Sequence, residues 1–452
     1  MSEFLQQISS IFWGIFLPLI IIAGSGVIYG TIKLIRQSTF SPEPPWRLKK
    51  VKSALTISLS SKIGTGAIIG VMAAMSRLGA VGINGEALLL WVLIGMLLLV
   101  PLTYAEVFLS RLAEQTPREF ISLVFNKKLG TVYILSLVML YSFGFVGFQF
   151  SGIQSVFKIA TKTIFHHQLT NYELVIFIML PIFLTILIIV LTRSHQLFIN
   201  VLGSLISSII LLYILFFIIF LFNTIHFIPQ YFSLMLAGIC QWHTVGIGIP
   251  IGLIIGFQRI IQISETALGT SSLSSSDGEN SPRREALLQT IATIFTLFIA
   301  VVITSYVFSY GIQQLPEVTL SNSGFERIAG YLFTAQSVTG LFGIIVIIAF
   351  FMVSGITTIL GSFHFVNVSL HCSEKRRSLV YMLLITTSGL ISVANFDIIF
   401  DIVDMLMFIV STIMIISLLK FLLLKPSRFL AQANIRLEDD EKNEKCRKRT
   451  EL

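Results

Sequence analysis

Apolar segments separated by short polar stretches follow one another along nearly the whole chain. A helix needs about 20 mainly apolar residues to cross a bilayer, and each segment reaches or approaches that length. The pattern predicts an all-α polytopic membrane protein with 11 transmembrane helices. They cover residues 11–35, 53–76, 86–110, 130–157, 171–192, 196–222, 243–268, 288–312, 338–370, 378–395 and 397–424.

The polar stretches complete this architecture. Residues 1–424 are predicted to form a single transmembrane domain, and the mixed charges of 425–452 are typical of a solvated cytoplasmic tail. The weakly amphipathic segment 320–336 predicts an interfacial helix on the external side. The Ser-rich segment 270–285 predicts a flexible cytoplasmic loop.

Composition narrows the class of protein. Only 12% of the 452 residues are charged and 55% are hydrophobic, whereas soluble domains carry about 25% charged residues. This excludes a soluble enzyme, a disordered protein and a nucleic-acid binder with a basic groove. The surroundings are therefore a lipid bilayer. The three cysteines indicate neither a disulfide framework nor a metal site.

The distribution of basic residues predicts an orientation. One set of alternate loops holds 15 Lys and Arg residues, and the other holds only Arg77, Lys158, Lys162 and Arg327. Because cytoplasmic loops carry the surplus of basic residues, we expect the N-terminus outside and the C-terminus in the cytoplasm. An odd number of helices agrees with this. The membrane is expected to be a plasma membrane, the inner membrane of a bacterium.

Two glycine clusters interrupt predicted helices. One lies at 62–70 and the other at 246–256, and they fall in the first and sixth helices once the leading helix is set aside. Such a pair is typical of transporters built from two inverted repeats. A broken helix frees N–H groups that suit a carboxylate and C=O groups that suit a cation or an ammonium. Close helix packing is the alternative explanation for either cluster alone.

Six segments, in order along the chain, match those of a known transporter family. They are Ala54–Val71, Tyr104–Glu106, Gly256–Gly269, Ser281–Gln289, Thr358–Gly361 and Asp401–Asp404. Together they resemble the alanine or glycine:cation symporter family, which includes sodium:alanine symporters and D-alanine/glycine permeases. The chain is identified as a divergent member.

The resemblance implies a leucine-transporter-type fold. Five helices in 53–222 and five in 243–424 form a 5+5 inverted repeat, and 11–35 is an extra N-terminal helix. It also implies secondary active transport of small neutral amino acids, alanine or glycine, L or D, coupled to a cation by alternating access.

The helix breaks predict where such a substrate binds. The backbone amides of Gly64, Thr65 and Gly66 are expected to receive the carboxylate. Carbonyls around Gly246, Gly248 and Gly252 are expected to receive the ammonium. Tight walls would then exclude larger side chains, at about 1–3 kcal/mol per methylene.

Lys62 departs from the family's pattern. The family's Thr-Val-Gly-Thr-Gly-Asn is Lys62-Ile-Gly-Thr-Gly-Ala67 here. A lysine within a membrane helix costs about 3 kcal/mol on insertion scales. Either the helix starts late and Lys62 reaches cytoplasmic water, or Lys62 belongs to the substrate or cation site. We hypothesise that its ammonium replaces one cation, which would make the protein proton-coupled or a sodium-independent exchanger.

Oxygen atoms on the ninth predicted helix have the spacing of a cation site. In leucine-transporter-like folds a sodium ion often lies between this helix and the first broken helix. The resemblance implies the carbonyls of Ile63 and Ser354 and the hydroxyls of Thr357 and Thr358 as ligands, and oxygen ligands suit a hard cation. The alternative is that these hydroxyls bond to their own helix backbone. No cofactor is expected beyond a coupling ion, sodium or a proton.

The remaining polar residues predict no catalytic chemistry. Arg259 and Glu265 are expected to belong to an inner gate or loop clamp. Asp397, Asp401 and Asp404 share one helix face, either as a polar bundle interior or as a proton relay. Intramembrane protease and hydrolase motifs are absent from the sequence, so we expect no enzyme. A non-transporting membrane sensor on the same fold is a further alternative, and the sequence leaves the oligomeric state open.

Overall fold

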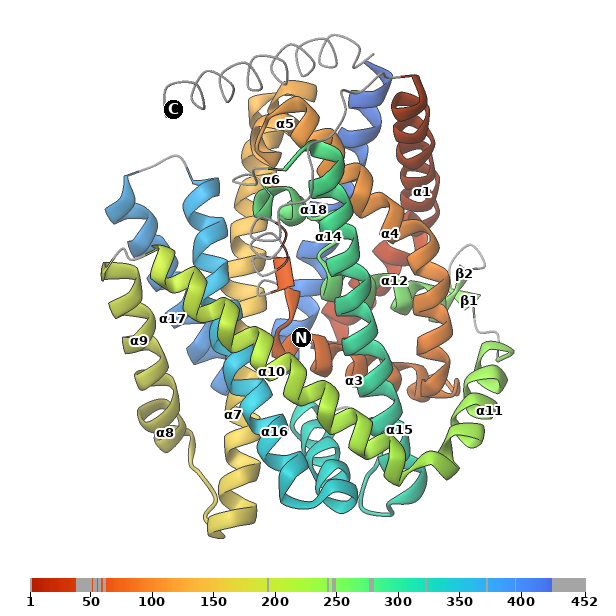
Figure 1. The fold of residues 1–452 in the computed structure, drawn as a ribbon, viewed down its shortest axis with the longest axis vertical. Helices are drawn as coiled ribbons and strands as arrows, with labels where there is room; N and C mark the ends of the chain where they lie inside the picture. The colour runs from red at the N-terminus through yellow and green to blue at the C-terminus, as the bar shows by residue number, and fades with distance from the viewer. Residues whose placement is uncertain are drawn as a thin grey trace, which may run out of the picture.

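The computed structural model describes most of the chain and is almost entirely helical (Figure 1). The predicted tail, 425–452, lies outside the described residues, as do Gly246 and Gly248. The described residues are 2–37, 51, 55, 58–59, 62–192, 195–241, 244–245, 249–275, 280–321, 323–370, 373–394 and 396–424.

Within these residues, eight helices are long and apolar enough to cross a membrane. This confirms a polytopic helical membrane protein but not the predicted count of 11. Three further apolar helices are shorter, at Thr65–Ala80, Ile225–Ile239 and Ile251–Ser264. The eight candidate spans are Ile11–Arg36, Gly85–Ala113, Lys127–Lys162, Asn171–Ile188, Gly203–Asn223, Pro282–Gln314, Gly324–Asn367 and Asp401–Leu423.

The individual helices follow the predicted apolar segments closely. Three of the spans contain a π-helical turn, a feature often found at functional sites. The helices are α1 (Ser2–Gln37), α4 (Leu88–Ala113), α6 (Lys127–Met139), η2 (Leu140–Phe145), α7 (Val146–Phe165), α8 (Asn171–Leu174), η3 (Val175–Met179), α9 (Leu180–Thr192), α10 (His195–Asn223), α14 (Pro282–Leu297), η5 (Phe298–Ile303), α15 (Thr304–Gln314), α16 (Gly324–Ser369), α17 (Glu374–Ala394) and α18 (Phe396–Leu423).

The two helices that contain the glycine clusters are both short. α3 (Thr65–Ala80) begins after Ile63 and Gly64, which are not helical, so the predicted break at this point is confirmed. α12 (Ile251–Ser264) starts only after a two-stranded turn, β1 (Thr244–Val245) and β2 (Ile249–Pro250).

The predicted helix 243–268 is therefore wrong at both ends. Pro250 lacks a backbone N–H and stands at the start of α12, and Glu265 at its end adopts a left-handed conformation with φ of 57°. The chain resumes as α13 (Thr270–Ser274), a buried helix. The first part of the predicted flexible loop 270–285 is therefore wrong too, because these residues pack inside the bundle.

Elements outside the predicted spans complete the fold. α5 (Pro117–Val124) starts with a capping box between Thr116 and Glu119. η1 (Gly85–Ala87), η4 (Ile225–Phe227) and α11 (Ile228–Ile239) complete the set. α16 consists of two helical segments that meet at Gly340, whose φ of 62° is non-helical. Its first segment corresponds to the interfacial helix predicted over 320–336.

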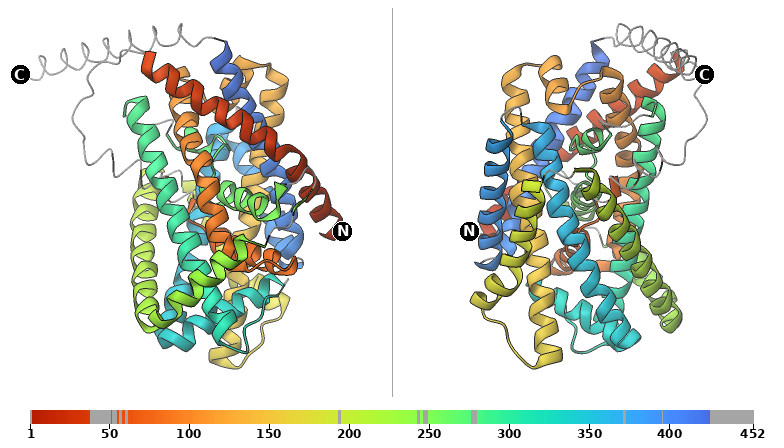
Figure 2. Two further views of the ribbon diagram at one scale, coloured as in Figure 1. Left: turned by 90° about the vertical axis from the view of Figure 1, so that its right-hand side faces the viewer. Right: turned by 60° about the vertical axis from the view of Figure 1, so that its left-hand side comes forward.

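α1 packs on the outside of the bundle against α18, so the first and last helices of the described chain lie side by side (Figure 2). Aromatic rings join the two helices, with the Trp13 and Phe408 centroids 5.4 Å apart. Inside the bundle, α3 contacts α7, α12 and α16. The break before α3 is therefore surrounded by protein on several sides.

Candidate substrate and ion site

Gly64 lies where two polar side chains meet the unwound backbone in front of α3. Its backbone is extended, with φ of −124° and ψ of 175°. A Cβ atom at this position would lie 2.8 Å from both the Gln149 Nε2 and the Thr358 Oγ1 atoms. Only glycine leaves room for this approach, which brings α7 and α16 together at the break.

Gln149 of α7 caps the first turn of α3. Its Oε1 atom accepts hydrogen bonds from the Thr65 backbone N–H (2.8 Å) and from the Thr65 hydroxyl (2.7 Å). Both side chains are buried. A neutral acceptor thus occupies one free N–H of the half-helix that was predicted to hold the substrate carboxylate. Gln149 was missed from the sequence, although a glutamine within an apolar span is a signal for a site.

The three hydroxyl-bearing residues of α16 differ in their hydrogen bonding. The Thr357 hydroxyl donates to the Ser354 carbonyl at 3.0 Å, as expected for a hydroxyl bonded to its own helix. The Ser354 Oγ and Thr358 Oγ1 atoms are buried and have no hydrogen-bond partner among the described residues. Buried hydroxyls are nearly always satisfied in proteins, so these two oxygens suit an additional ligand.

Lys62 is buried, 4% exposed, and does not reach the surface. Its Nζ donates to the hydroxyl of Thr293 on α14 at 3.0 Å. The charges of Glu265 and Glu106 both act on it, and these two carboxylates are buried as well. The break before α3, the end of α12 and the interior of α4 therefore share one cluster of three ionisable groups.

The loop after α12 carries Glu265 in a strained backbone. Glu265 and Ala267 have φ of 57° and 61°, values that are uncommon for residues other than glycine. The Tyr133 hydroxyl donates to the Leu268 carbonyl at 2.6 Å, and the Ser272 hydroxyl donates to the Glu106 carboxylate at 3.4 Å. Side chains of α4 and α6 thus hold the loop in place, and strain of this kind tends to occur at functional sites.

Arg259 lies apart from Glu265, in an ion network with the last helix. Its Nη2 donates to both carboxylate oxygens of Asp404, at 2.7 and 3.0 Å. Arg77 at the end of α3 pairs with Asp404 at 3.0 Å and with Asp401 at 3.3 Å. Asp401 and Asp404 therefore form a polar bundle interior. The side chain of Asp397 lies outside the described part of the chain.

Gly252, the described member of the predicted ammonium-binding set, faces a tryptophan. It lies in the first turn of α12, and a Cβ there would come within 2.1 Å of the Trp91 Nε1 atom. A Cβ at Gly256, one turn later, would lie 3.0 Å from the Trp91 backbone. Close packing of α12 on α4 accounts for both glycines, and the structure does not bring Gly252 to the break before α3.

The helical bundle is similar in fold to a membrane transporter of known structure. A Na⁺-coupled sialic acid symporter, in a substrate-bound outward-open state, is similar over 86% of this chain and 80% of its own, with a TM-score of 0.51 at 14% identity. A manganese transporter of Eremococcus coleocola covers 84% of this chain and 80% of its own, with a TM-score of 0.49 at 14% identity. At these identities the likeness concerns the fold alone.

The family is shown by sequence. The profile of the sodium:alanine symporter family matches residues 1–445, and the chain belongs to this family. The predicted resemblance is confirmed over essentially the whole chain. Symporters transport their substrates and are not enzymes. A search of curated proteins gave no match.

Proposed function

We propose that the protein is a secondary active transporter that carries a small neutral amino acid, alanine or glycine, together with a cation by alternating access. Family membership supports coupled transport. The main support for an ion site is a pair of buried oxygens without a hydrogen-bond partner among the described residues, Ser354 Oγ and Thr358 Oγ1. Thr358 also lies against the unwound backbone at Gly64. Sodium would bind there, with the carbonyl of Ile63 and the hydroxyl of Thr357 as further ligands.

The substrate carboxylate binds in this proposal at the start of α3. The amides of Gly64 and Gly66 and the dipole of the half-helix attract an anion, and the Thr65 amide can join them only by giving up its bond to Gln149 Oε1. The Nε2 atom of Gln149 lies 3.8 Å from the Cβ position of Gly66, and the Phe148 ring lies at 3.4 Å. These walls leave room only for a small side chain, which favours alanine and glycine.

The transmembrane arrangement in this proposal has 11 helices, with the second break at Glu265–Gly269 instead of the Gly246–Gly252 cluster. The N-terminus lies outside and the C-terminus in the cytoplasm of a bacterial inner membrane. One five-helix repeat then contributes α3 and the other contributes α12 and α13. Arg259 and Glu265 keep their proposed role in gating.

Coupling to protons is a second candidate, favoured by the cluster around Lys62. A fixed ammonium near the break supplies a positive charge where the family carries an uncharged residue, and Glu106 and Glu265 offer places for a transported proton. Uptake that proceeds without sodium would support this alternative, and uptake that requires sodium would support the site at Thr358.

The test is uptake of isotope-labelled alanine and glycine into proteoliposomes under an imposed sodium or proton gradient. We expect concentrative uptake under one gradient and its loss in Gly66→Leu, because a leucine fills the space in front of the α3 amides. Gly66→Ala is the matched control for folding, since its Cβ makes ordinary contact with Phe148. No uptake under either gradient, or wild-type uptake by Gly66→Leu, would refute the proposal.

A further inference from the structure

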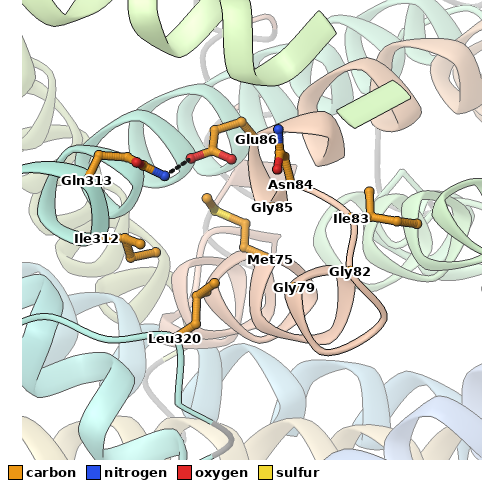
Figure 3. Close-up of a pocket in the computed structure, with 10 residues that line it drawn as sticks. All are labelled: Met75, Gly79, Gly82, Ile83, Asn84, Gly85, Glu86, Ile312, Gln313 and Leu320. Atoms are coloured by element: carbon orange, nitrogen blue, oxygen red, sulfur yellow. Dashed lines mark hydrogen bonds between the residues drawn. The ribbon is translucent and has the colours of Figure 1, made fainter. Parts of the chain in front are cut away.

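A cavity with a polar side chain at its wall lies at the opposite end of α3 from Gly64. It has a volume of about 240 Å³ and is lined by the end of α3, the turn at Gly82–Glu86, α15 and Leu320 (Figure 3). α3 has 16 residues, which at 1.5 Å per residue separates its two ends by roughly 24 Å. The cavity is therefore distinct from the site in front of Thr65.

Glu86 brings a buried carboxylate to this cavity. The residue is 3% exposed. Its Oε1 atom accepts a hydrogen bond from the Ser309 hydroxyl at 2.6 Å. The same atom accepts a second bond from Gln313 Nε2 at 3.4 Å (Figure 3). Both bonds end on the same oxygen. Among the described residues, Oε2 accepts no hydrogen bond, and no Lys, Arg or His side chain forms an ion pair with Glu86.

The surroundings of Glu86 suit a positive charge. A buried carboxylate without a cationic partner is costly. The N–H groups of an ammonium would donate to its free oxygen. The C-terminal end of α3, whose residues Met75 and Gly79 line the cavity, adds the negative end of a helix dipole. Both contributions favour a cation over an anion.

The rest of the lining selects an organic cation over a bare metal ion. Met75, Ile83, Ile312 and Leu320 contribute apolar surface, whereas Ca²⁺ and Mg²⁺ take about six or more oxygen ligands. The volume exceeds that of one ion and matches a small organic molecule. Gly82, Gln313 and Leu320 are exposed at the rim, so the cavity is open to molecules from outside.

We propose that this cavity is an outer binding site for the ammonium group of a small amino acid, held by Glu86 before the substrate reaches the break in front of α3. The inference rests on the proposed transport of amino acids. The cavity is reached from the end of the molecule that the basic residues assign to the external side. The short apolar walls take the substrate side chain, and the carboxylate of Glu86 takes the ammonium.

Equilibrium binding of isotope-labelled ethylamine to the purified protein tests this site separately from transport. Ethylamine lacks a carboxylate and so cannot use the α3 amides. We expect saturable binding, displaced by alanine but not by propionate. Glu86→Gln keeps the acceptor for Ser309 and Gln313 but removes the charge, and should weaken ethylamine binding at least tenfold. Glu317→Gln, an exposed carboxylate on the neighbouring loop, is the matched control and should bind as wild type does.

A second variant tests the cavity with its charge intact. Leu320→Trp fills the space beside Gly79 from a half-exposed position and should also weaken ethylamine binding, while thermal unfolding stays unchanged. Ethylamine binding that is absent, or equally strong in Glu86→Gln, would overturn the inference even where alanine uptake is normal. Glu86-dependent binding that alanine does not displace would overturn the assignment to the transported substrate. Glu86-dependent binding that alanine does displace would sustain the site even if the proteoliposomes showed no uptake.

Discussion

Gln149 and Lys62 are the neutral and the charged polar side chains at the break before α3. Gln149 offers a neutral amide whose oxygen satisfies Thr65 and whose nitrogen faces the Gly64 backbone. Lys62 offers a full charge, but directs it toward Thr293 and two buried glutamates. Gln149 is therefore the side chain that meets the start of α3, whereas the Lys62 ammonium bonds to α14.

This arrangement predicts a strong effect of Gln149→Ala. Loss of the Gln149 amide removes a donor to the substrate carboxylate and an acceptor for the Thr65 N–H. Each of these is worth about 1–3 kcal/mol when buried. Alanine uptake should fall at least about tenfold, since 1.4 kcal/mol corresponds to a factor of 10. Gln154→Ala removes another buried glutamine of α7, one that bonds to Ser392 at 3.1 Å, and should retain uptake. Equal losses in both variants would contradict a substrate contact at Gln149.

Lys62→Met separates the two coupling candidates. If Lys62 replaces a bound cation, wild-type uptake should tolerate choline in place of sodium, and Lys62→Met should abolish uptake. The variant also leaves the buried Glu106 and Glu265 without the positive charge of Lys62, and should therefore unfold at a lower temperature than the wild type. Adding Glu265→Gln should recover part of the thermal stability but no transport.

The opposite outcome is equally clear for Lys62. A wild type that requires sodium, together with normal transport by Lys62→Met, would make the lysine a structural residue. Lys62→Arg keeps the charge with a different shape and serves as the control for charge alone.

At the scale of helices, the sequence predicted the break at Gly64 correctly but placed both ends of the seventh predicted helix wrongly. The break at Gly64 could be found because only glycine tolerates Gln149 and Thr358 at 2.8 Å. The cluster at Gly252 and Gly256 looks alike in sequence, but its glycines admit Trp91. The chain leaves α12 through Glu265 and Ala267 in left-handed conformations. Tertiary contacts impose those conformations, and residue type gives no warning of them.

The same limit applies to the polar contacts between helices. Apolar periodicity located most helices to within a few residues, because burial of apolar segments is what the pattern records. The pairing of Lys62 with Thr293, or of Gln149 with Thr65, joins residues 231 and 84 positions apart. One sequence alone does not contain such pairings.

Between α3 and α16, we expect Thr358→Ala to change the unfolding temperature differently with and without sodium. Thr358→Ala removes a buried oxygen that has no partner without an ion. Without sodium, the variant should unfold at the same or a slightly higher temperature, since an unsatisfied buried hydroxyl costs about 1–3 kcal/mol. With sodium, it should lose the stabilisation that ligand binding gives to a folded protein. Thr386→Ala, an exposed hydroxyl that bonds to the Met382 carbonyl, is the control. A sodium-induced shift of wild-type size in Thr358→Ala would show that the ion binds elsewhere.

At the scale of the whole molecule, one ion network joins α3 and α12 to α18. Asp404 of α18 receives Arg259 from α12 and Arg77 from α3. Its backbone carbonyl also accepts the Trp13 Nε1–H of α1 at 3.3 Å. Asp404 therefore contacts α1, α3 and α12 at once, and α3 has a further ion pair with Asp401 of the same helix. Alternating access requires helices to separate around the substrate, so this contact has to loosen in one of the two states.

The last prediction compares the two aspartates of this network. Arg259 and Asp404 side chains are each 1% exposed, whereas the side chain of Arg77, the partner of Asp401, is 23% exposed. Removing one partner of a buried pair costs about 3–5 kcal/mol, but partly exposed pairs contribute about 0–1 kcal/mol. Asp404→Asn should therefore lower the unfolding temperature strongly and abolish alanine uptake, while Asp401→Asn should change both only slightly. The two variants differ by one turn of the same helix, so effects of similar size would mean that the network does not hold α3 and α12 through Asp404.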